Sequence, residues 1–278
     1  MRTAIIHDTD NDGTMAAALI LNAEPEAALF PVRSYEKERL AELSTILPNL
    51  YDNVCMVDIS APGETMVKFS MAQKFLWFDH HTSAEGAFGM YDGRQAIGKS
   101  ATALVWEYVN PRLQMPPWAA YINEYDIFHE QNEPRFANLV IPFQIFMERV
   151  CNVQAYLEIS RQLDKRPQLL DGFVDIGRKL WASELALYNH APITAREIGP
   201  YKVLVGTKPA SPGRYAWWLR KLEYKSDFFI SGRDAGDKWV YSIRSLRPGA
   251  DCLEFIDRMG FAGGGHVKAA GFSTPTQL

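Results

Sequence analysis

Residues 3–21 read TAIIHDTDNDGTMAAALIL: a short apolar run, an acidic turn and an alanine-rich segment. The run Thr3–Ile6 is typical of a buried strand, and Thr14–Leu21 is typical of a helix that begins after Gly13. A strand that leads directly into a helix is half of a βα repeat, the unit from which parallel sheets are built. The stretch therefore predicts an α/β fold with polar side chains at the carboxyl end of its first strand.

The same alternation continues along the chain. Apolar runs at Phe30–Val32, Asn53–Val57 and Lys74–Phe78 predict further strands, and a helix through Met71 is expected after the Pro62–Gly63 turn. The three strongest strands are followed by carboxylates or imidazoles: His7 and the aspartates after it, Asp58, and the run Asp79, His80 and His81. Because the carboxyl ends of parallel strands share one edge of a sheet, we expect these side chains to converge in a crevice there.

The remainder of the chain divides near His190–Pro192. Residues from Ser100 to about Tyr188 have a mostly helical pattern, interrupted by prolines. Short strands then resume, with helices among them, and this second αβ unit leads into the glycine-rich run at 262–266. The expected strands are Lys202–Val205, Asp227–Ile230 and Trp239–Ile243, and the expected helices are Tyr215–Leu222 and Asp251–Met259. We expect a catalytic domain over 1–150, a helical connector over 151–190 and a smaller α/β domain over 191–278.

The charge balance limits the partners of the protein. The 278 residues are 47% hydrophobic and 22% charged, a composition typical of a globular protein. The net charge of −4 argues against a broad binder of duplex nucleic acid. Residues 1–190 nevertheless hold 16 Lys and Arg against 25 Asp and Glu, or −9, and residues 191–278 hold 13 against 8, or +5. This division points to function only if the charges converge on one site; otherwise it describes two solvated surfaces.

The cysteines and the N-terminus indicate a cytoplasmic protein. Cys55, Cys151 and Cys252 show no spacing of a zinc knuckle or of a disulfide framework. Charged residues appear before any signal-peptide core, and no apolar run is long enough to span a bilayer. A reducing cytoplasm is the simplest location, and no membrane partner is expected.

The turn from His7 to Gly13 is the strongest chemical signal. It offers an imidazole and several carboxylates on one strand-to-helix turn. Carboxylates at such density repel one another unless a cation neutralises them, so the turn predicts a metal site. A calcium loop would need a further Gly and Glu at fixed later positions, which the sequence lacks. An acidic helix N-cap without a metal is the structural alternative.

A second signal follows the strand Lys74–Phe78. Asp79, His80 and His81 combine carboxylate and imidazole donors, which suit Mn²⁺ or a similar metal better than Ca²⁺. Asp58 after its strand, and Asp126 in a helical segment, would each be weak signals alone, because single aspartates are common in such places.

Taken in order, these motifs resemble the DHH/DHHA1 phosphoesterases. The set is His-x-x-Asp-x-Asp-Gly, then Val-Asp, then Asp-His-His, then a helical Asp and a distal Gly-Gly-Gly-His, and it covers nearly the whole chain. The resemblance is greatest to the oligoribonuclease (nanoRNase, NrnB-like) branch. It implies a DHH domain with a parallel sheet, a DHHA1 domain and two divalent metal ions, usually manganese.

The resemblance also implies roles for single residues. One ion would be held by His7, Asp10 and Asp58, and the other by Asp12, Asp58, His80 and Asp126. Asp79 would orient an imidazole, and His81 would contact the scissile phosphate or protonate the leaving oxygen. The turn also fits the Asp-x-Asp-x-Asp-Gly form of RecJ-type exonucleases, in which Asp8 would take part of the role of His7.

The basic C-terminal part carries the expected substrate residues. Arg244 and Ser245 resemble the family's strand motif that reaches a substrate phosphate, and Gly263, Gly264, Gly265 and His266 resemble its substrate-binding loop. Arginine offers a planar fork for phosphate oxygens, and glycines allow close backbone approach. Ala262 replaces the first glycine of the commoner four-glycine form. Taken alone, the glycine-rich loop could be a flexible turn. The nearby aromatic residues Tyr215, Trp217 and Trp218 are expected to pack against a helix rather than stack on a base.

The expected reaction is metal-dependent hydrolysis of a phosphodiester in short single-stranded RNA or a linear dinucleotide, releasing nucleoside monophosphates. Alternatives of the same class are a 3′-phosphoadenosine 5′-phosphate phosphatase, a cyclic-dinucleotide phosphodiesterase and a single-strand DNA exonuclease. A nucleotide-binding regulator with a dead site is the alternative of another class, although every ligand position is filled. Stable binding of duplex nucleic acid is not expected, and a homodimer is left open.

Overall fold

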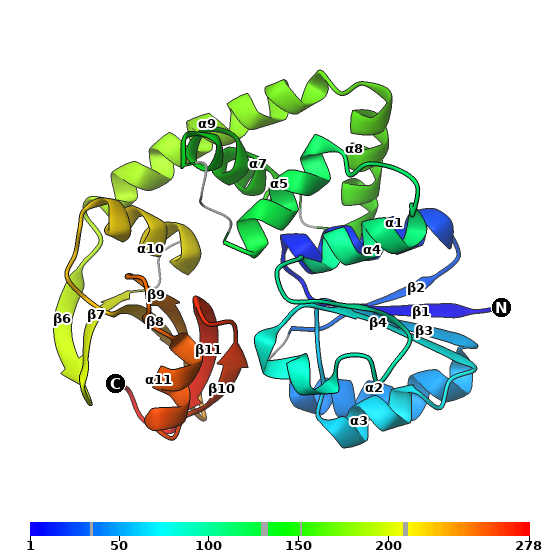
Figure 1. Ribbon diagram of the computed structural model, residues 1–278, viewed down its shortest axis with the longest axis horizontal. Coiled ribbons are helices and arrows are strands. Elements are labelled where there is room, and N and C mark those ends of the chain that lie inside the picture. Colours follow the sequence, from blue (N-terminus) through cyan, green and yellow to red (C-terminus); the bar gives the residue numbers. More distant parts are fainter. Residues whose placement is uncertain (34–35, 129–132, 151, 208–210) are drawn as a thin grey trace. The chain divides into compact units, whose positions relative to one another are not determined.

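The computed structural model describes residues 1–33, 36–128, 133–150, 152–207 and 211–278. The chain divides into two compact units, residues 1–181 and residues 182–278, and each contains one sheet (Figure 1). The first sheet is parallel and flanked by helices, and the second belongs to a smaller α/β unit. The predicted fold class is therefore confirmed.

The first sheet has five parallel strands in the order β2-β1-β3-β4-β5. The strands are β1 (Thr3–His7), β2 (Ala28–Pro31), β3 (Asn53–Val57), β4 (Lys74–Asp79) and β5 (Gly93–Gln95). The register pairs His7 with Val57 and Val57 with Phe78, so β1, β3 and β4 end side by side. Their carboxyl ends form the edge that the sequence predicts.

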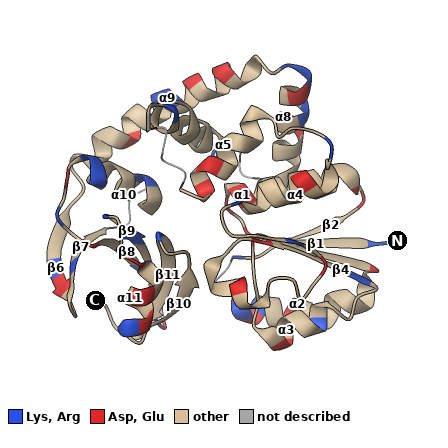
Figure 2. Cartoon of the chain, viewed as in Figure 1, with Lys and Arg blue, Asp and Glu red and all other residues tan. Residues whose placement is uncertain are grey.

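Helices cover both faces of this sheet (Figure 1). They are α1 (Asn11–Ala23), α2 (Lys37–Leu50), α3 (Gly63–Phe69) and α4 (Ala101–Val109), with a short 3₁₀ helix, η1 (Thr82–Ala87), after β4. Alternation along the strands sends Ile6, Met56 and Trp77 into one fully buried core with Leu40 of α2 and Phe69 of α3. Helices α1 and α4 pack against each other on the opposite face. Helix α1 has one charged residue, Asp12. Figure 2 shows charged residues of both signs in both units.

A helical layer follows the sheet in sequence, as predicted. It comprises α5 (Pro117–Asp126), α6 (Glu133–Arg135), the π-helix η2 (Phe136–Val140), α7 (Ile141–Met147), α8 (Val153–Lys165) and α9 (Leu169–Tyr188). Helix α8 packs against α1. Helix α9 crosses the division between the two units, which lies between Trp181 and Ala182.

The second unit contains a six-stranded mixed sheet in the order β10-β11-β9-β8-β7-β6. Its strands are β6 (Ile193–Ile198), β7 (Tyr201–Thr207), β8 (Phe228–Asp234), β9 (Trp239–Ser245), β10 (Ala262–Gly265) and β11 (Ala269–Thr274). Helices α10 (Pro212–Lys221) and α11 (Cys252–Arg258) complete it. An ion pair between Arg214 and Glu184 is buried here, at 3.0 Å.

The glycine-rich run differs from the loop or turn expected from the sequence. Residues 262–265 form β10, paired antiparallel with β11. A Cβ on Gly263 would lie 2.3 Å from the carbonyl oxygen of Gly271, and Gly265 has a φ of 138°. The glycines therefore permit a close strand pairing that larger residues would obstruct.

Other differences concern short or edge strands. The sequence did not predict β5, which has three residues, or β6, which is largely exposed. It also did not predict β11, a mostly buried strand of small and polar residues around one phenylalanine. Among the described residues, no helix combines the length and hydrophobicity that a membrane span requires.

Candidate metal centre

The polar side chains at the ends of β1, β3 and β4 converge around His80. Its Nε2 lies 3.1 Å from Oδ1 of Asp58, 3.0 Å from Oδ2 of Asp126 and 3.7 Å from Oδ2 of Asp12. The donor atoms of Asp12, His80 and Asp126 all lie within 4.8 Å of one another. The first turn of α1, the ends of β3 and β4 and helix α5 thus bring together residues that are distant in sequence.

The turn after β1 is shaped by its own hydrogen bonds. Asp10 is the N-cap of α1, and its Oδ1 accepts the N–H of Gly13 at 2.9 Å. A Cβ on Gly13 would lie 2.6 Å from the carbonyl oxygen of Asp8, so this turn closes only around a glycine. The alternative interpretation of the turn, as a helix N-cap, is thus correct for Asp10. Capping does not prevent metal binding, because each carboxylate oxygen has a second lone pair.

Asp12 is held by the start of α4. Its Oδ2 accepts the N–H of Ala101 at 2.6 Å and its Oδ1 accepts the N–H of Thr102 at 2.9 Å. The Thr102 hydroxyl also donates to the backbone carbonyl of Asp12 at 3.1 Å. Ser100 is the N-cap of α4, and its hydroxyl accepts the N–H of Ala103. The carboxylate is therefore oriented by a helix N-terminus that favours negative charge.

Asp58 has an unusual backbone. Its φ is 58°, in the left-handed region, and its N–H donates to the Phe78 carbonyl at 2.8 Å. Aspartate and asparagine tolerate this conformation better than most residues, although it still costs energy. The strained backbone occurs at the strand end where the Asp58 carboxylate meets His80.

Asp79 organises the two histidines after it. Its Oδ1 accepts the N–H of His80 at 2.8 Å and lies 2.6 Å from Nδ1 of His81. Asp79 is fully buried, whereas the His81 side chain is 23% exposed. His81 is thus oriented by a buried carboxylate while its ring reaches solvent.

His7 and Asp8 occupy different environments. His7 is buried, with Nδ1 2.7 Å from the Asp8 carbonyl oxygen, and its buried Nε2 has no hydrogen-bond partner among the described residues. Asp8 is half-buried, and its Oδ1 accepts the N–H of Thr9 at 2.5 Å. A buried imidazole nitrogen without a partner is the kind of atom that a metal ion satisfies.

The carboxylates repel one another in the absence of a cation. Burial raises the pKa of Asp12 and of Asp58, and neighbouring carboxylates raise both further. The pKa of Asp10 rises to about 6 through desolvation and through repulsion from Asp126 and Asp12. It is therefore unfavourable for all of these carboxylates to be ionised at once unless a positive charge lies among them.

The histidines supply part of that counter-charge. Burial lowers the pKa of His80, but Asp126 and Asp58 outweigh this effect and raise it to about 12. Burial likewise lowers the pKa of His81, and Asp79 reverses the direction, so the net shift is upward. Without a metal, the His80 proton therefore takes the place of a cation among the carboxylates.

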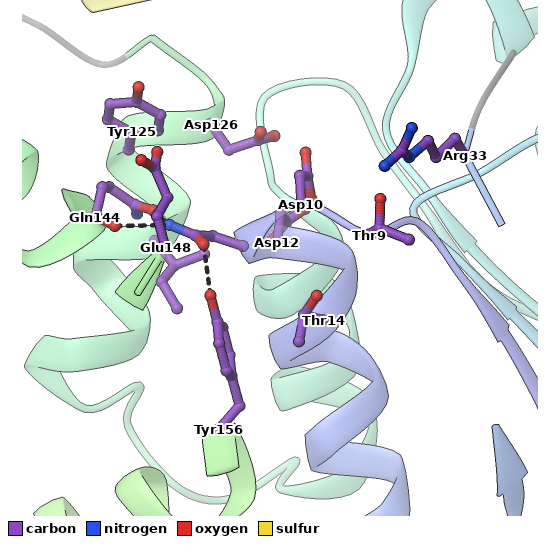
Figure 3. Close-up of a pocket in the computed structure, with 12 residues that line it drawn as sticks. Thr9, Asp10, Asp12, Thr14, Arg33, Tyr125, Asp126, Gln144, Glu148 and Tyr156 are labelled. Carbon is purple, nitrogen blue, oxygen red and sulfur yellow. Dashed lines mark hydrogen bonds between the residues drawn. The ribbon is translucent and has the colours of Figure 1, made fainter. Parts of the chain in front are cut away.

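A pocket of about 330 Å³ opens beside the carboxylates (Figure 3). Figure 3 shows Asp10, Asp12 and Asp126 gathered in its middle, with Arg33 on one side and Glu148 on the other. Its lining is mostly polar: Thr9, Asp10, Asn11, Asp12, Thr14, Arg33, Ile122, Tyr125, Asp126, Gln144, Glu148 and Tyr156. Several of these residues come from the helical layer, so the pocket is formed by that layer as well as by the carboxyl ends of the strands.

Apart from Asp126, which the sequence predicts, the contributors from the helical layer were missed. Gln144 and Tyr156 are buried and hydrogen-bonded to Asn11, and Asn123 accepts the Ser100 N–H at 2.8 Å. A Gln or Tyr in a helix carries no local sign of such a role. Asn11 is the one residue that could have pointed to this network. It lies between two candidate ligands, and its polar side chain is not needed to cap the helix.

The expected substrate residues lie in the second unit. Arg244 is on β9, where its Nη1 donates to the Ile243 carbonyl at 2.8 Å, and the neighbouring Ser245 donates to the Arg247 carbonyl at 2.9 Å. Gly263, Gly264 and Gly265 are in β10, and His266 directly follows it. Tyr215 is 1% exposed and packs on Phe229, in agreement with the packing interpretation.

The donor set of the first unit fits divalent metal ions. It combines imidazole nitrogens with several carboxylate oxygens, a mixture that suits Mn²⁺ and similar ions. The buried Nε2 of His7 and the buried Oδ2 of Asp79 have no hydrogen-bond partner among the described residues. The residues present therefore match a metal centre in donor type, burial and charge.

Comparisons with known proteins bear on the fold. No family model and no curated protein matches the sequence. A solved structure described as the DHH domain of a member of a ribosomal protein family is 16% identical, with a TM-score of 0.57 over 98% of this chain and 82% of that one. The exonuclease RecJ bound to manganese is 14% identical, with a TM-score of 0.49 over 98% and 86% of the two chains.

A third structure is the pGpG-specific phosphodiesterase PggH from Vibrio cholerae. It is 12% identical, with a TM-score of 0.47 over 99% of this chain and 93% of that one. At such identities a likeness concerns the fold alone. The match with a TM-score of 0.57 shows that this chain shares the fold of a structure described as a DHH domain.

Proposed function

We propose that the protein is a metal-dependent phosphodiesterase that hydrolyses very short RNA or linear dinucleotides to nucleoside monophosphates. The observation that carries this proposal is the convergence of Asp12, Asp58 and Asp126 on the buried Nε2 of His80, within 3.0–3.7 Å. Such a dense carboxylate cluster is stable mainly when cations neutralise it. The shared DHH-domain fold supports the same proposal.

The proposed ligands follow the motifs in the sequence. We propose that both ions are Mn²⁺. One would be held by His7, Asp10 and Asp58, and the other by Asp12, Asp58, His80 and Asp126. The buried, unpartnered Nε2 supports His7 rather than Asp8 as the ligand. When bound, two such cations lower the pKa of a water molecule and neutralise the charge of a phosphoryl group.

The remaining chemistry belongs to side chains of this chain. Hydrolysis adds water to the phosphorus atom and breaks its bond to the leaving oxygen, which needs a proton. His81 is placed to deliver that proton, because Asp79 orients its ring and raises its pKa, which favours the protonated form. Asp79 would act through His81 rather than touch the substrate.

The second unit would supply substrate contacts. We propose that Arg244 and Ser245 bind a phosphate next to the scissile one, and that Gly263, Gly264, Gly265 and His266 border the terminal nucleotide. The proposed domains remain a DHH domain over 1–150, a connector over 151–190 and a DHHA1 domain over 191–278. The +5 charge of the last segment suits an anionic substrate.

The test is a substrate panel with purified full-length protein and Mn²⁺. The panel contains a length ladder of end-labelled RNA, the same ladder in DNA, cyclic and linear dinucleotides, and 3′-phosphoadenosine 5′-phosphate. We expect the shortest RNAs and linear dinucleotides to be cleaved fastest, and chelation to abolish cleavage. His80→Gln should lose turnover, whereas Asp175→Asn, at an exposed aspartate of α9, should retain it.

The panel also separates the alternatives. Activity only on cyclic dinucleotides, only on the bisphosphate or only on DNA would replace the proposed substrate while keeping the metal centre. Nucleotide binding with no cleavage of any substrate would point to a regulator. Wild-type rates in His80→Gln would overturn the assignment of the centre itself.

A further inference from the structure

Asn11 is part of the acidic turn, but its side chain is directed to the helical layer. Its Nδ2 donates to the Gln144 carbonyl at 3.0 Å and also contacts Oε1 of the same residue. Its Oδ1 accepts the hydroxyl of Tyr156 (Figure 3). The residue between Asp10 and Asp12 thus joins the turn to α7 and α8.

The partners of Asn11 are buried and fixed. Gln144 is 1% exposed and Tyr156 is 2% exposed. The Gln144 side-chain amide also donates to the Tyr121 carbonyl of α5 at 3.3 Å. Hydrogen bonds to buried partners are stronger than fully exposed ones, and losing one member leaves costly unpaired groups. We name Asn11, Gln144 and Tyr156 the amide clamp.

The amide clamp opposes a force that the metal centre itself creates. Asp12 and Asp126 lie 3.7 Å and 3.0 Å from the same atom, His80 Nε2, and Asp10 is two residues from Asp12, so these carboxylates repel one another. Asp12 is tied to α4, and Asp10 caps α1, but neither contact anchors the turn to the helical layer. The side chain of Asn11 supplies hydrogen bonds from this turn to α7 and α8.

We infer that the amide clamp is a positioning device that sets the affinity of the centre for metal ions. By holding the turn closed against carboxylate repulsion, it fixes Asp10 and Asp12 before an ion arrives, so the ion need not order them. None of the three clamp residues needs to coordinate the ion. This inference rests on the proposed function of the same site.

The test compares Mn²⁺ affinity in three full-length variants by isothermal titration calorimetry. Tyr156→Phe removes one hydroxyl and keeps the ring, and Asn11→Ala removes the clamp. Ser160→Ala is the matched control, because Ser160 is a buried hydroxyl one turn further along α8 that donates only to the Leu157 carbonyl in the described hydrogen bonds. We expect Tyr156→Phe and Asn11→Ala to weaken Mn²⁺ binding by about 10- to 100-fold, and Ser160→Ala to leave it unchanged.

A purely structural role predicts a different result. It would lower the melting temperature of Tyr156→Phe without changing its Mn²⁺ affinity, and that outcome overturns the inference. A positioning role further predicts that excess Mn²⁺ restores the maximal rate of Tyr156→Phe on the best substrate. If the wild type binds Mn²⁺ and Tyr156→Phe binds it equally well, only the role of the amide clamp is disproved. If the wild type binds no Mn²⁺, the proposed function is disproved as well.

Discussion

At the scale of single residues, Asp58 meets two requirements at once. Its backbone has a φ of 58°, and its carboxylate lies 3.1 Å from His80 Nε2. Asparagine satisfies the first requirement and not the second, because it tolerates the left-handed conformation but carries no charge. The two requirements can therefore be separated by substitution.

We expect Asp58→Asn to fold and to lose its response to metal. Mn²⁺ should raise the melting temperature of the wild type, since a ligand of the native state stabilises it, and the rise should largely vanish in Asp58→Asn. Asp58→Ala should be less stable with or without Mn²⁺, by about 1–2 kcal/mol, because alanine is strained at this φ. Thermal unfolding with and without Mn²⁺ measures both effects, and equal Mn²⁺ stabilisation of Asp58→Asn would contradict the ligand role.

The buried thiols predict a pH dependence of stability. Burial raises the pKa of Cys55 to about 12, so the fold favours the neutral thiol. The stabilising contribution of this group is complete below the pKa of the unfolded chain, near 9, and declines as the pH rises toward 12. The loss should be about 1.4 kcal/mol per pH unit in that interval.

The measurement compares wild type with Cys55→Ala by urea unfolding between pH 8 and pH 10.5. The difference in unfolding free energy between the two proteins should shrink as the pH rises, because only the wild type loses the contribution of Cys55. Titration of lysines and tyrosines affects both proteins alike and cancels. A difference that stays constant over this interval would contradict the raised pKa. Cys151 lies outside the described residues and is present in both proteins.

At the scale of elements, the sequence predicts best where its signals are local. Strands β1, β3 and β4 and the residues at their ends were predictable because apolar runs followed by carboxylates are contiguous patterns. The partners of Asn11 were not, since Gln144 and Tyr156 lie 133 and 145 residues away. The strand β10 was missed because three consecutive glycines normally indicate a loop, and only its pairing with β11 makes it a strand.

Helix α9 allows a prediction with an internal control. A Cβ on Gly177 would lie 1.9 Å from the Pro142 carbonyl oxygen of α7, whereas a Cβ on Gly172 would meet nothing within 4 Å. Gly177→Ala should therefore lower the unfolding free energy by about 1–3 kcal/mol through overpacking. Gly172→Ala should raise it by about 0.4–1 kcal/mol, because alanine favours the helix and restricts the unfolded chain. Urea unfolding of both variants is the measurement, and equal stabilities would show that α7 and α9 can move apart freely.

At the scale of the whole molecule, the net charge of −4 is the sum of −9 on residues 1–190, which carry the candidate metal centre, and +5 on residues 191–278, which carry the expected substrate residues. Two divalent ions would bring the formal total to zero. The acidic average excludes a broad duplex binder but does not exclude a nuclease with metal ions and a basic unit. Chemistry and substrate binding should then respond differently to substitution.

Arg244→Ala tests that separation. We expect KM for a dinucleotide to rise about tenfold or more, since a charged hydrogen bond to phosphate is lost, while kcat changes little. Lys238→Ala, at an exposed lysine next to β9, is the control and should change neither constant. Steady-state kinetics on the best substrate of the panel measure both. An equal fall in kcat and in kcat/KM with KM unchanged would instead mean that Arg244 interacts with the substrate only in the transition state.

Helix α9 runs from Leu169 to Tyr188 and so joins the two units without a loop. Proteases cut extended exposed segments far more readily than helices. The point where the chain passes from one unit to the other should therefore resist limited proteolysis, even though trypsin sites at Arg178 and Lys179 are close by. Fragments that correspond to the separate units should be rare among early digestion products, and expressing either unit alone would require cutting through a helix rather than removing a linker.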